Sequence, residues 1–458
     1  MACSTPQRIQ ATLDAAGVSH FVDPDLKEHL LRLYFFWEDP SIHVVKEDVF
    51  YRERERCRSG NATSKFYSEV LANSTCAICA ALTPRHCVEL PEPMVDFFAS
   101  RAKALLDAEM DSPTLSTVQS LVILSGVEAA VTLDARGRLY YGMAIPSLNE
   151  NTITTPAYVT TSDEPRFWQP YIDDLEDFDF PQLPDPTEEM HKHNATLCAK
   201  MTKIRETLYS DSVVPTIGPQ RLHDFASDMR SELLVWHSEL PTSLLVDLTS
   251  VSSFYVPHVL QRHMQYHCVM ILVNRPFFSA STATLRDVAF TDPMVGRPAC
   301  TDSARVISKL LQIYRRLYRF RRINVQAEHL IFTVSLIHVF NACEAKEPCL
   351  KNSAWKDLEV CCQALTEMGK GYKNALRALG VVNSIRTELL NATRESVKRD
   401  SLSAPGAEYN QGPSNRRGST WEDEDTLNCP GAFGHTNISQ DDTLLNPALN
   451  IIDSLFWS

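Results

Sequence analysis

The chain has 458 residues, 44% of them hydrophobic and 22% charged, a composition typical of a folded globular protein. Its formal net charge of −13 argues against a general nucleic-acid-binding surface, which needs a surplus of Lys and Arg. No run of about 18 apolar residues predicts a transmembrane helix, and the first residues lack the charged and apolar regions of a secretory signal. We therefore expect an intracellular protein whose 13 cysteines are reduced.

The first part of the sequence has the periodicity of helices that bury one face. Apolar side chains recur every three or four residues in 24–40, 64–82 and 94–110, a spacing that places them on one side of a helix. Pro40 ends the first of these stretches because proline cannot continue a helix. Residues 1–23 are expected to form only a short leader.

Residues 114–145 predict two helices joined by a tight polar turn. The first helix is apolar on almost every side, which is typical of a helix inside a core. Ser116 and Gln119 have the spacing of a capping box, and Ser112–Pro113 offers an alternative start. The turn is predicted at Asp134–Gly137.

The helical pattern breaks between residues 146 and 186. Six prolines from Pro146 to Pro184 and a run of acidic residues at 173–179 predict a long irregular loop, which is uncommon inside a compact domain. No stretch of the chain has the alternation of a β-strand, so the predicted fold class is all-α, an irregular multi-helix domain. Helical spacing returns after the loop in seven stretches: 187–210, 219–240, 256–274, 301–320, 324–342, 354–369 and 371–392.

The C-terminal residues have a different composition from the rest. Beyond residue 395 the chain is rich in Ser, Gly, Pro and Asn, and disorder is predicted. Residues 421–458 hold seven acidic side chains and no Lys or Arg. Acidic residues interleaved with bulky apolar ones are typical of a segment that folds onto a partner, although a tail without function is the alternative. The side chains expected to bind that partner are Ile452, Leu455, Phe456 and Trp457.

These features divide the chain into five parts. They are a leader, a first helical region, a Pro-rich and acidic loop, a second helical region and a disordered acidic tail: 1–23, 24–145, 146–186, 187–395 and 396–458.

One acidic cluster suggests an enzyme. The sequence DDLED at Asp173–Asp177 matches the D-D-x-x-D pattern with which all-α prenyl-diphosphate enzymes hold Mg²⁺ against a diphosphate. Those enzymes need a second metal motif that ends in Glu, and the nearest candidate, which begins at Ser227, has Val235 at that position. We therefore interpret the cluster as an acidic loop and expect no enzymatic activity. A magnesium-dependent prenyl-diphosphate enzyme is the remote alternative.

Two groups of residues have spacings found in metal sites. His263 and His267 would lie on one helical face, but no acid in the general-base position and no third ligand accompany them. For the histidines we favour a place in the core or on the helix surface. For the cysteines of the second group we favour buried thiols, because Cys76 and Cys79 stand in an apolar helical stretch. No cofactor is expected in this chain. The second group could supply four zinc ligands: Cys76, Cys79, His86 and Cys87.

The basic stretch 314–322, YRRLYRFRR, interleaves five arginines with aromatic residues. Such a pattern could contact nucleic acid or act as a nuclear-import signal. In an amphipathic helix the same pattern places Tyr314, Leu317 and Tyr318 in the core and the arginines in solvent. We favour this second interpretation.

Several stretches together resemble the fungal-specific transcription factor domain, the all-helical middle region of fungal zinc-cluster regulators. The most characteristic is TLSTVQSLVILSGVEAAVTLDARGRLYYGMAI at 114–145. The similarity is nearest to regulators of the nitrogen-assimilation type and reaches about residue 385. Five further stretches match the family in the right order: LRLYFFWEDPSIHVVKEDVF, LLVWHSELPTSL, YVPHVLQRHMQYHCVMILVNRPFF, IYRRLYRFRRINVQAEHLIFTVSLIHVFNA and CCQALTEMGKGYKNALRALGVV.

The resemblance implies a transcription regulator that acts in the nucleus and controls a metabolic or biosynthetic pathway. Its partners would be related regulators, in a homodimer or heterodimer, and the transcription apparatus reached through the acidic tail. A module that lacks DNA binding and titrates related regulators is the alternative.

The sequence departs from the family pattern in two places. The family's six-cysteine zinc cluster, which reads DNA, would precede the helical domain, but only Cys3 stands before it here. We therefore expect no direct DNA binding by this chain, and zinc only if a missing N-terminal cluster exists. The family's GMAI helix usually leads into an arginine-rich helix, whereas here it meets Pro146. We expect a deletion after Ile145, which would affect any internal effector pocket.

Overall fold

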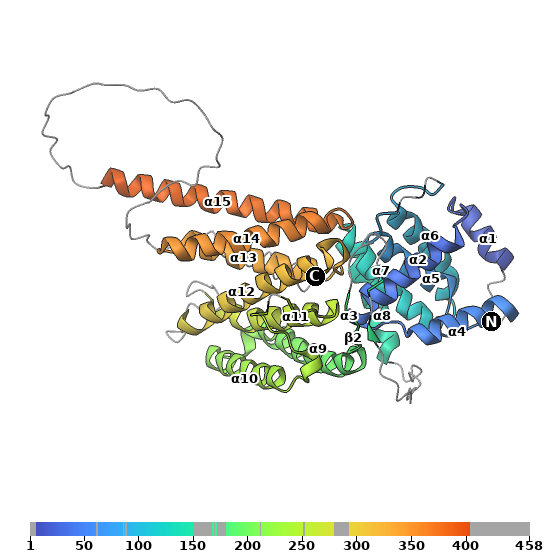
Figure 1. Cartoon of the computed structure of the whole chain (residues 1–458), viewed down its shortest axis with the longest axis horizontal. Coiled ribbons are helices and arrows are strands. Elements are labelled where there is room, and N and C mark those ends of the chain that lie inside the picture. Colours follow the sequence, from blue (N-terminus) through green and yellow to red (C-terminus); the bar gives the residue numbers. More distant parts are fainter. Residues whose placement is uncertain are drawn as a thin grey trace, which may run out of the picture.

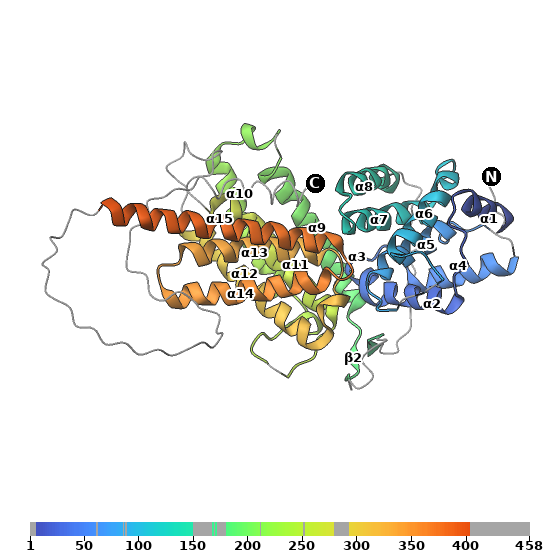
Figure 2. The same ribbon diagram turned by 90° about the horizontal axis from the view of Figure 1, so that it is seen from above.

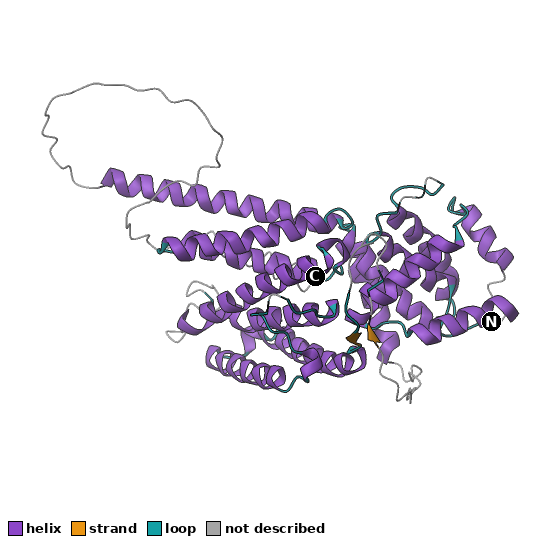
Figure 3. Cartoon of the chain, in the orientation of Figure 1, coloured by secondary structure: helices purple, strands orange, loops and turns teal. Residues whose placement is uncertain are grey.

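The computed structural model describes residues 6–60, 63–85, 87, 89–149, 167–168, 170–171, 180–210, 212–250, 252–278 and 293–403. Over these residues the chain is helical almost throughout (Figure 3), which confirms the predicted all-α class. Within this described part, no helix is both long enough and apolar enough to span a bilayer. The helices form two groups, α1–α8 and α9–α15, which lie side by side along the long axis of the molecule (Figure 1 and Figure 2).

The first group is built around α5 (Glu69–Ala80). Its side chains from Val70 to Ala80 are all buried, and it packs against α2, α6 and α7. The Ser68 hydroxyl accepts a hydrogen bond from the Leu71 N–H at 3.2 Å and so caps the first turn. The other elements of this group are α1 (Pro6–Ala15), α2 (Pro24–Leu33), a π-helical turn (Tyr34–Glu38), α3 (Asp39–Ile42), α4 (Glu47–Gly60), α6 (Met94–Met110), α7 (Leu115–Ala130) and α8 (Asp134–Asn149).

Two helices of this group are absent from the sequence prediction. Helix α1 lies within the expected leader and buries only Leu13. Helix α4 buries Val49, Phe50 and Arg54 and is otherwise charged or polar. Helices with so few buried apolar residues leave no clear periodic pattern in the sequence.

The second group is built around α11 (Pro257–Asn274). Of its 18 residues, only Gln265 and His267 are not fully buried, and it packs against α9, α10, α12 and α13. The other helices of this group are α9 (Thr187–Leu208), α10 (Pro219–Ser238), α12 (Pro293–Tyr318), α13 (Ala327–Glu344), α14 (Pro348–Met368) and α15 (Lys373–Ser403).

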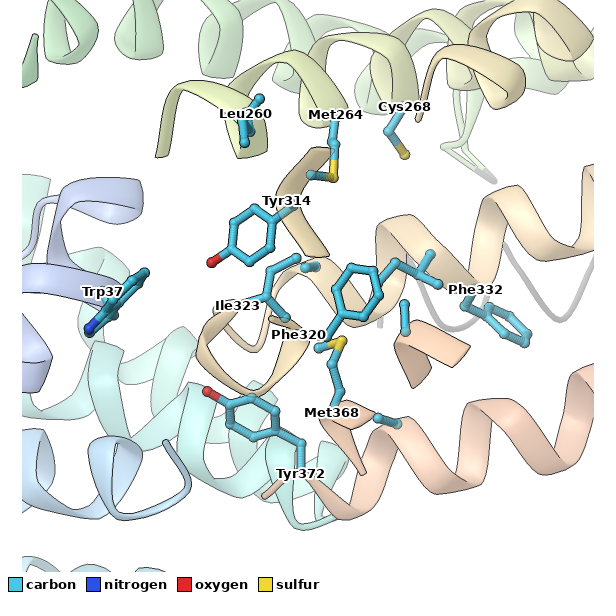
Figure 4. Packing of buried hydrophobic residues seen from close by; sticks show 14 of the residues in the cluster. Trp37, Leu260, Met264, Cys268, Tyr314, Phe320, Ile323, Phe332, Met368 and Tyr372 are labelled. Atoms are coloured by element: carbon cyan, nitrogen blue, oxygen red, sulfur yellow. The ribbon is translucent and has the colours of Figure 1, made fainter. Parts of the chain in front are cut away.

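One hydrophobic core connects the two groups (Figure 4). Trp37 of the first group meets Tyr318 of α12 edge-on, with 5.6 Å between the ring centroids. The Tyr372 hydroxyl donates to the Glu38 carboxylate at 3.0 Å. Gly371 lies so close to the end of α5 that a Cβ would clash with the Ala81 carbonyl. Side-chain packing and a close backbone approach therefore hold the two groups together.

The start of α7 differs from the predicted capping box. Thr114 is the N-cap residue, and its N–H donates to the Thr117 hydroxyl at 3.0 Å. Ser116 is buried inside the first turn, where its N–H donates to the Lys65 carbonyl at 2.9 Å. Gln119 instead donates to the Val44 carbonyl at 2.7 Å. The prediction was wrong because a Thr pair satisfies the same backbone groups two residues earlier.

Helix α8 crosses α7 closely and runs beyond the expected end. A Cβ on Gly137 would lie 2.8 Å from the Ser125 carbonyl oxygen, so this crossing requires glycine. The helix continues through Pro146 to Asn149, whereas the sequence predicted an end at Ile145. A proline near a helix end removes a single backbone hydrogen bond, and the helix can therefore accommodate it there.

The predicted irregular loop contains a small β-ribbon. Strand β1 (Phe167–Trp168) pairs antiparallel with β2 (Leu183–Pro184). Trp168 is buried between the helix groups, with its ring centroid 6.3 Å from that of Trp37 and 5.9 Å from that of His258. Strands of two residues are too short to produce an alternating pattern, which explains why the sequence did not predict them.

Candidate functional site

The site begins at the turn after α3, which Asp39 organises. The Asp39 carboxylate is buried and accepts hydrogen bonds from the backbone N–H groups of Val44 at 3.0 Å and Val45 at 2.8 Å. The Tyr34 hydroxyl also donates to it at 3.1 Å. His43 takes a left-handed backbone conformation, with φ of 48°, and so reverses the chain. This turn fixes Ser41 against α11.

Helix α11 presents polar side chains to this turn although it is buried. The Ser41 hydroxyl donates to the Gln261 side-chain carbonyl at 2.5 Å, and Gln261 donates in turn to the Tyr314 hydroxyl at 3.4 Å. Arg262 donates from Nη2 to the Ser41 carbonyl at 3.1 Å and from Nη1 to the Gln265 side-chain carbonyl. A polar layer therefore lies between α3 and α11.

A cavity of about 210 Å³ opens beside this layer, where α3, α9, α11 and the start of α13 meet. We call it the α3–α11–α13 cavity. Its walls combine polar side chains from α11 and from the turn before α13 with apolar side chains from α9, α11 and α13. The lining residues are Ser41, Met201, Gln261, Arg262, Gln265, Cys268, Val269, Asn324, Gln326, Ala327, His329 and Leu330.

Arg262 is the unusual member of this lining. Only 7% of its surface is exposed, and no carboxylate of the described residues forms an ion pair with it. Its Nε group is buried and makes no hydrogen bond. Burial lowers the pKa of Arg262 to about 10. The guanidinium is thus still charged at neutral pH, and only neutral oxygens partner it.

The histidines near Arg262 add no further positive charge. Burial is the largest of the causes that lower the pKa of His258 to about 3, and the nearby His191 and Arg262 contribute less. Burial and the stacked ring of His43 are the main causes that lower the pKa of His191 to about 4. Both imidazoles are therefore neutral at physiological pH.

A second and larger cavity, of about 400 Å³, lies between α12, α13 and α14. Arg297 at its edge pairs with Glu344 at 3.0 Å, and Arg305 pairs with Asp302 at 3.6 Å. Because these arginines already have acidic partners, this cavity offers less attraction to an anion than the α3–α11–α13 cavity.

Of the two histidines that the sequence marked as possible metal ligands, His263 lies in the core and His267 is half-buried. His263 is 6% exposed and pairs through Nε2 with the Leu244 carbonyl at 2.7 Å. Its Nδ1 lies 3.4 Å from Nε2 of His237. Burial lowers the pKa of His263 to about 4 and that of His267 to about 3. In the described part of the chain, no three His, Cys, Asp or Glu side chains are placed to hold a metal ion.

Two members of the cysteine group, Cys76 and Cys79, are buried as the apolar context predicted. Cys76 and Cys79 lie on α5 and are fully buried, and burial raises the pKa of Cys76 to about 12. Thiols in such surroundings are inert and pack as small apolar side chains. Cys87 is a free, half-buried thiol, and His86 lies outside the described residues.

The basic stretch 314–322 mostly follows the amphipathic interpretation. Tyr314, Leu317 and Tyr318 are buried in the core. Arg315 is bound to α14 through Glu367 at 3.2 Å. Arg322 is the exception, because it is buried with its guanidinium 5.9 Å from the Trp37 ring centroid. A nucleic-acid contact would have to compete with these intramolecular partners.

Two further groups of predicted site residues lie outside the described residues. They are the acidic cluster Asp173–Asp177 and the four tail side chains Ile452, Leu455, Phe456 and Trp457.

Sequence reasoning missed the α3–α11–α13 cavity. One signal was available: before the terminal Arg275, Arg262 is the only one of the Asp, Glu, Lys and Arg residues in PHVLQRHMQYHCVMILVNR, which was predicted as one helix. An arginine inside a helix that is buried all round requires a partner or a role.

Comparison with known proteins gives the relatives of this chain. No protein-family model matches it. It is 25% identical to the nitrogen assimilation transcription factor nit-4 of Neurospora crassa, over 79% of this chain and 36% of that protein. It is 24% identical to the nitrogen assimilation transcription factor nirA of Emericella nidulans, over 79% of this chain and 44% of that protein. It is 23% identical to the notoamide biosynthesis transcriptional activator notL' of Aspergillus versicolor, over 65% of this chain and 54% of that protein.

These alignments carry two further facts. The chain spans only 36% and 44% of the lengths of the two nitrogen assimilation factors. The same two alignments run over 415 and 416 positions but include 79% of the 458 residues, which is about 362, so roughly fifty positions have no residue of this chain. The deletion after Ile145 stays a prediction.

Proposed function

We propose that this chain, a homologue of fungal zinc-cluster transcription regulators, is a transcription regulator that controls a metabolic or biosynthetic pathway. The observation that carries the proposal is the match to two nitrogen assimilation transcription factors over 79% of the chain. The all-α architecture supports it, because the family motifs fall on packed helices. The motif at 114–145, for example, forms α7 and most of α8.

The proposed mode of action is through protein partners in the nucleus. The net charge of −13 disfavours a general attraction to nucleic acid. The acidic C-terminal segment, with its interleaved bulky apolar residues, supports contact with the transcription apparatus through Ile452, Leu455, Phe456 and Trp457. Related regulators are the proposed dimer partners.

A reporter assay tests this proposal. Residues 396–458, fused to a heterologous DNA-binding domain, should activate a reporter, and the double change Phe456→Ala with Trp457→Ala should reduce activation at least about fivefold because large apolar anchors dominate such contacts. Asn450→Ala in the same segment is the matched control and should leave activation unchanged. No activation by the wild-type segment, or equal activation by the double variant at equal protein level, would contradict the proposed role of the tail.

A further inference from the structure

The α3–α11–α13 cavity contains a buried positive charge that the described residues do not neutralise. Arg262 donates two hydrogen bonds, to the Ser41 carbonyl and the Gln265 side-chain carbonyl, and both acceptors are neutral. Its Nε–H has no acceptor. A buried charge without a counter-charge is costly, and guanidinium geometry is suited to bind the two oxygens of a carboxylate. An oxyanion is the class of ligand that matches this charge and these donors.

The same cavity offers a further hydrogen-bond donor beside the charge. The Gln265 side-chain N–H₂ donates to the Met201 sulfur at 3.4 Å. A thioether is a weak acceptor, so this amide group gains from a stronger acceptor such as a carboxylate oxygen. Gln265 is half-buried, and it lies one helical turn from Gln261 on the same wall of the cavity.

Another part of the wall is apolar, although Asn324, Gln326 and His329 also line the cavity. Cys268 and Val269 of α11 are each 1% exposed, and Met201 and Leu330 complete this side. Apolar walls favour a ligand with a short hydrocarbon part over a bare inorganic anion. The volume of about 210 Å³ is several times the roughly 30 Å³ that one water occupies.

We propose that the α3–α11–α13 cavity binds a small monocarboxylate, whose charged end pairs with Arg262 and Gln265 and whose hydrocarbon part lies against Met201, Val269 and Leu330. The cavity lies where the two helix groups meet, since Ser41 belongs to the first and the other lining residues to the second. This inference goes beyond the proposed function and does not depend on it, because binding to the helical domain is measured separately from activation by the tail.

The test is calorimetric titration of the full chain with butyrate and with butyramide, its neutral analogue of similar shape. Butyrate should bind at least about tenfold more tightly, because hydrogen bonds between charged groups are the stronger ones. Nitrate, a planar oxyanion without a hydrocarbon part, should bind more weakly than butyrate. Equal binding of butyrate and butyramide, no binding of butyrate, or nitrate binding as tight as butyrate would overturn the proposal.

Three variants locate the site. Arg262→Met should weaken butyrate at least about tenfold while leaving butyramide unchanged. Leu330→Trp, which fills the cavity and keeps Arg262, should weaken both ligands. Arg221→Met removes an exposed charge on α10 and should change neither. If circular dichroism shows that Arg262→Met is unfolded, the Leu330→Trp variant becomes the test. The proposal is contradicted if this variant binds butyrate with the same affinity as the wild-type protein.

Discussion

Two buried charges show how differently the two helix groups treat an ionised side chain. Glu128 of α7 is 1% exposed, and its carboxylate pairs with Lys103 of α6 at 2.9 Å and with Arg136 of α8 at 3.5 Å. Arg262 of α11 is similarly buried but has only neutral partners, and it lines a cavity. A charge neutralised inside the fold ties helices together, whereas an unneutralised charge beside a cavity is available to a ligand.

Removal of the partners of Glu128 should produce the largest effect. The double change Lys103→Met with Arg136→Met leaves a carboxylate buried without a counter-charge, and we expect the free energy of unfolding to fall by about 3–5 kcal/mol. Urea denaturation followed by circular dichroism measures it. A loss under about 1 kcal/mol would show that Glu128 does not tie α6, α7 and α8 together.

A third buried ionisable side chain, Glu38, differs from Glu128 and Arg262 because its charge depends on pH. It lies at the junction of the helix groups, where burial raises its pKa from 4.5 to about 7. The unfolded chain therefore releases this proton at lower pH than the folded chain, and stability falls as pH rises between about 4.5 and 7. Glu38→Gln should match wild type near pH 4.5 and be more stable above pH 7, by up to roughly 3 kcal/mol.

Urea midpoints of wild type and Glu38→Gln at several pH values check this prediction. The side-chain carbonyl of Gln still accepts a hydrogen bond from the Tyr372 hydroxyl. Both proteins therefore keep this hydrogen bond. Parallel pH profiles of the two proteins would contradict a raised pKa at Glu38.

Removal of Arg262 should have the smallest effect on stability. Arg262→Met takes away a buried charge that has no counter-charge, and replacement of buried ionic groups by apolar ones is often neutral or stabilising. Without added carboxylate, we expect the free energy of unfolding to change by less than about 1 kcal/mol or to rise. Thermal unfolding of the two proteins measures it. A loss of several kcal/mol in the free energy of unfolding would show that Arg262, like Glu128, is a structural residue.

The comparison also explains what could be predicted from sequence. Helices α6, α7 and α11 were predicted because their apolar residues are numerous and stand in long uninterrupted stretches. The capping residue Thr114 was missed because several nearby hydroxyl side chains fit a cap equally well.

The cavity could not be predicted in the same way. Its walls come from Ser41, from α9, from α11 and from residues 324–330, which no local pattern brings together. Within α11 the helical spacing predicted a helix, but only the packed structure shows that Arg262 has no acidic partner among the described residues. The pairing of Glu128 with Lys103 and Arg136 likewise depends on how three helices pack.

A crystal structure of the full chain grown with butyrate tests the central claim, that Arg262 is a ligand-binding charge, most directly. We expect a carboxylate within hydrogen-bond distance of the Arg262 guanidinium, with its hydrocarbon part toward Val269 and Leu330, and no such density in crystals grown with butyramide. Butyrate bound elsewhere, with Arg262 still partnered only by Ser41 and Gln265, would contradict it.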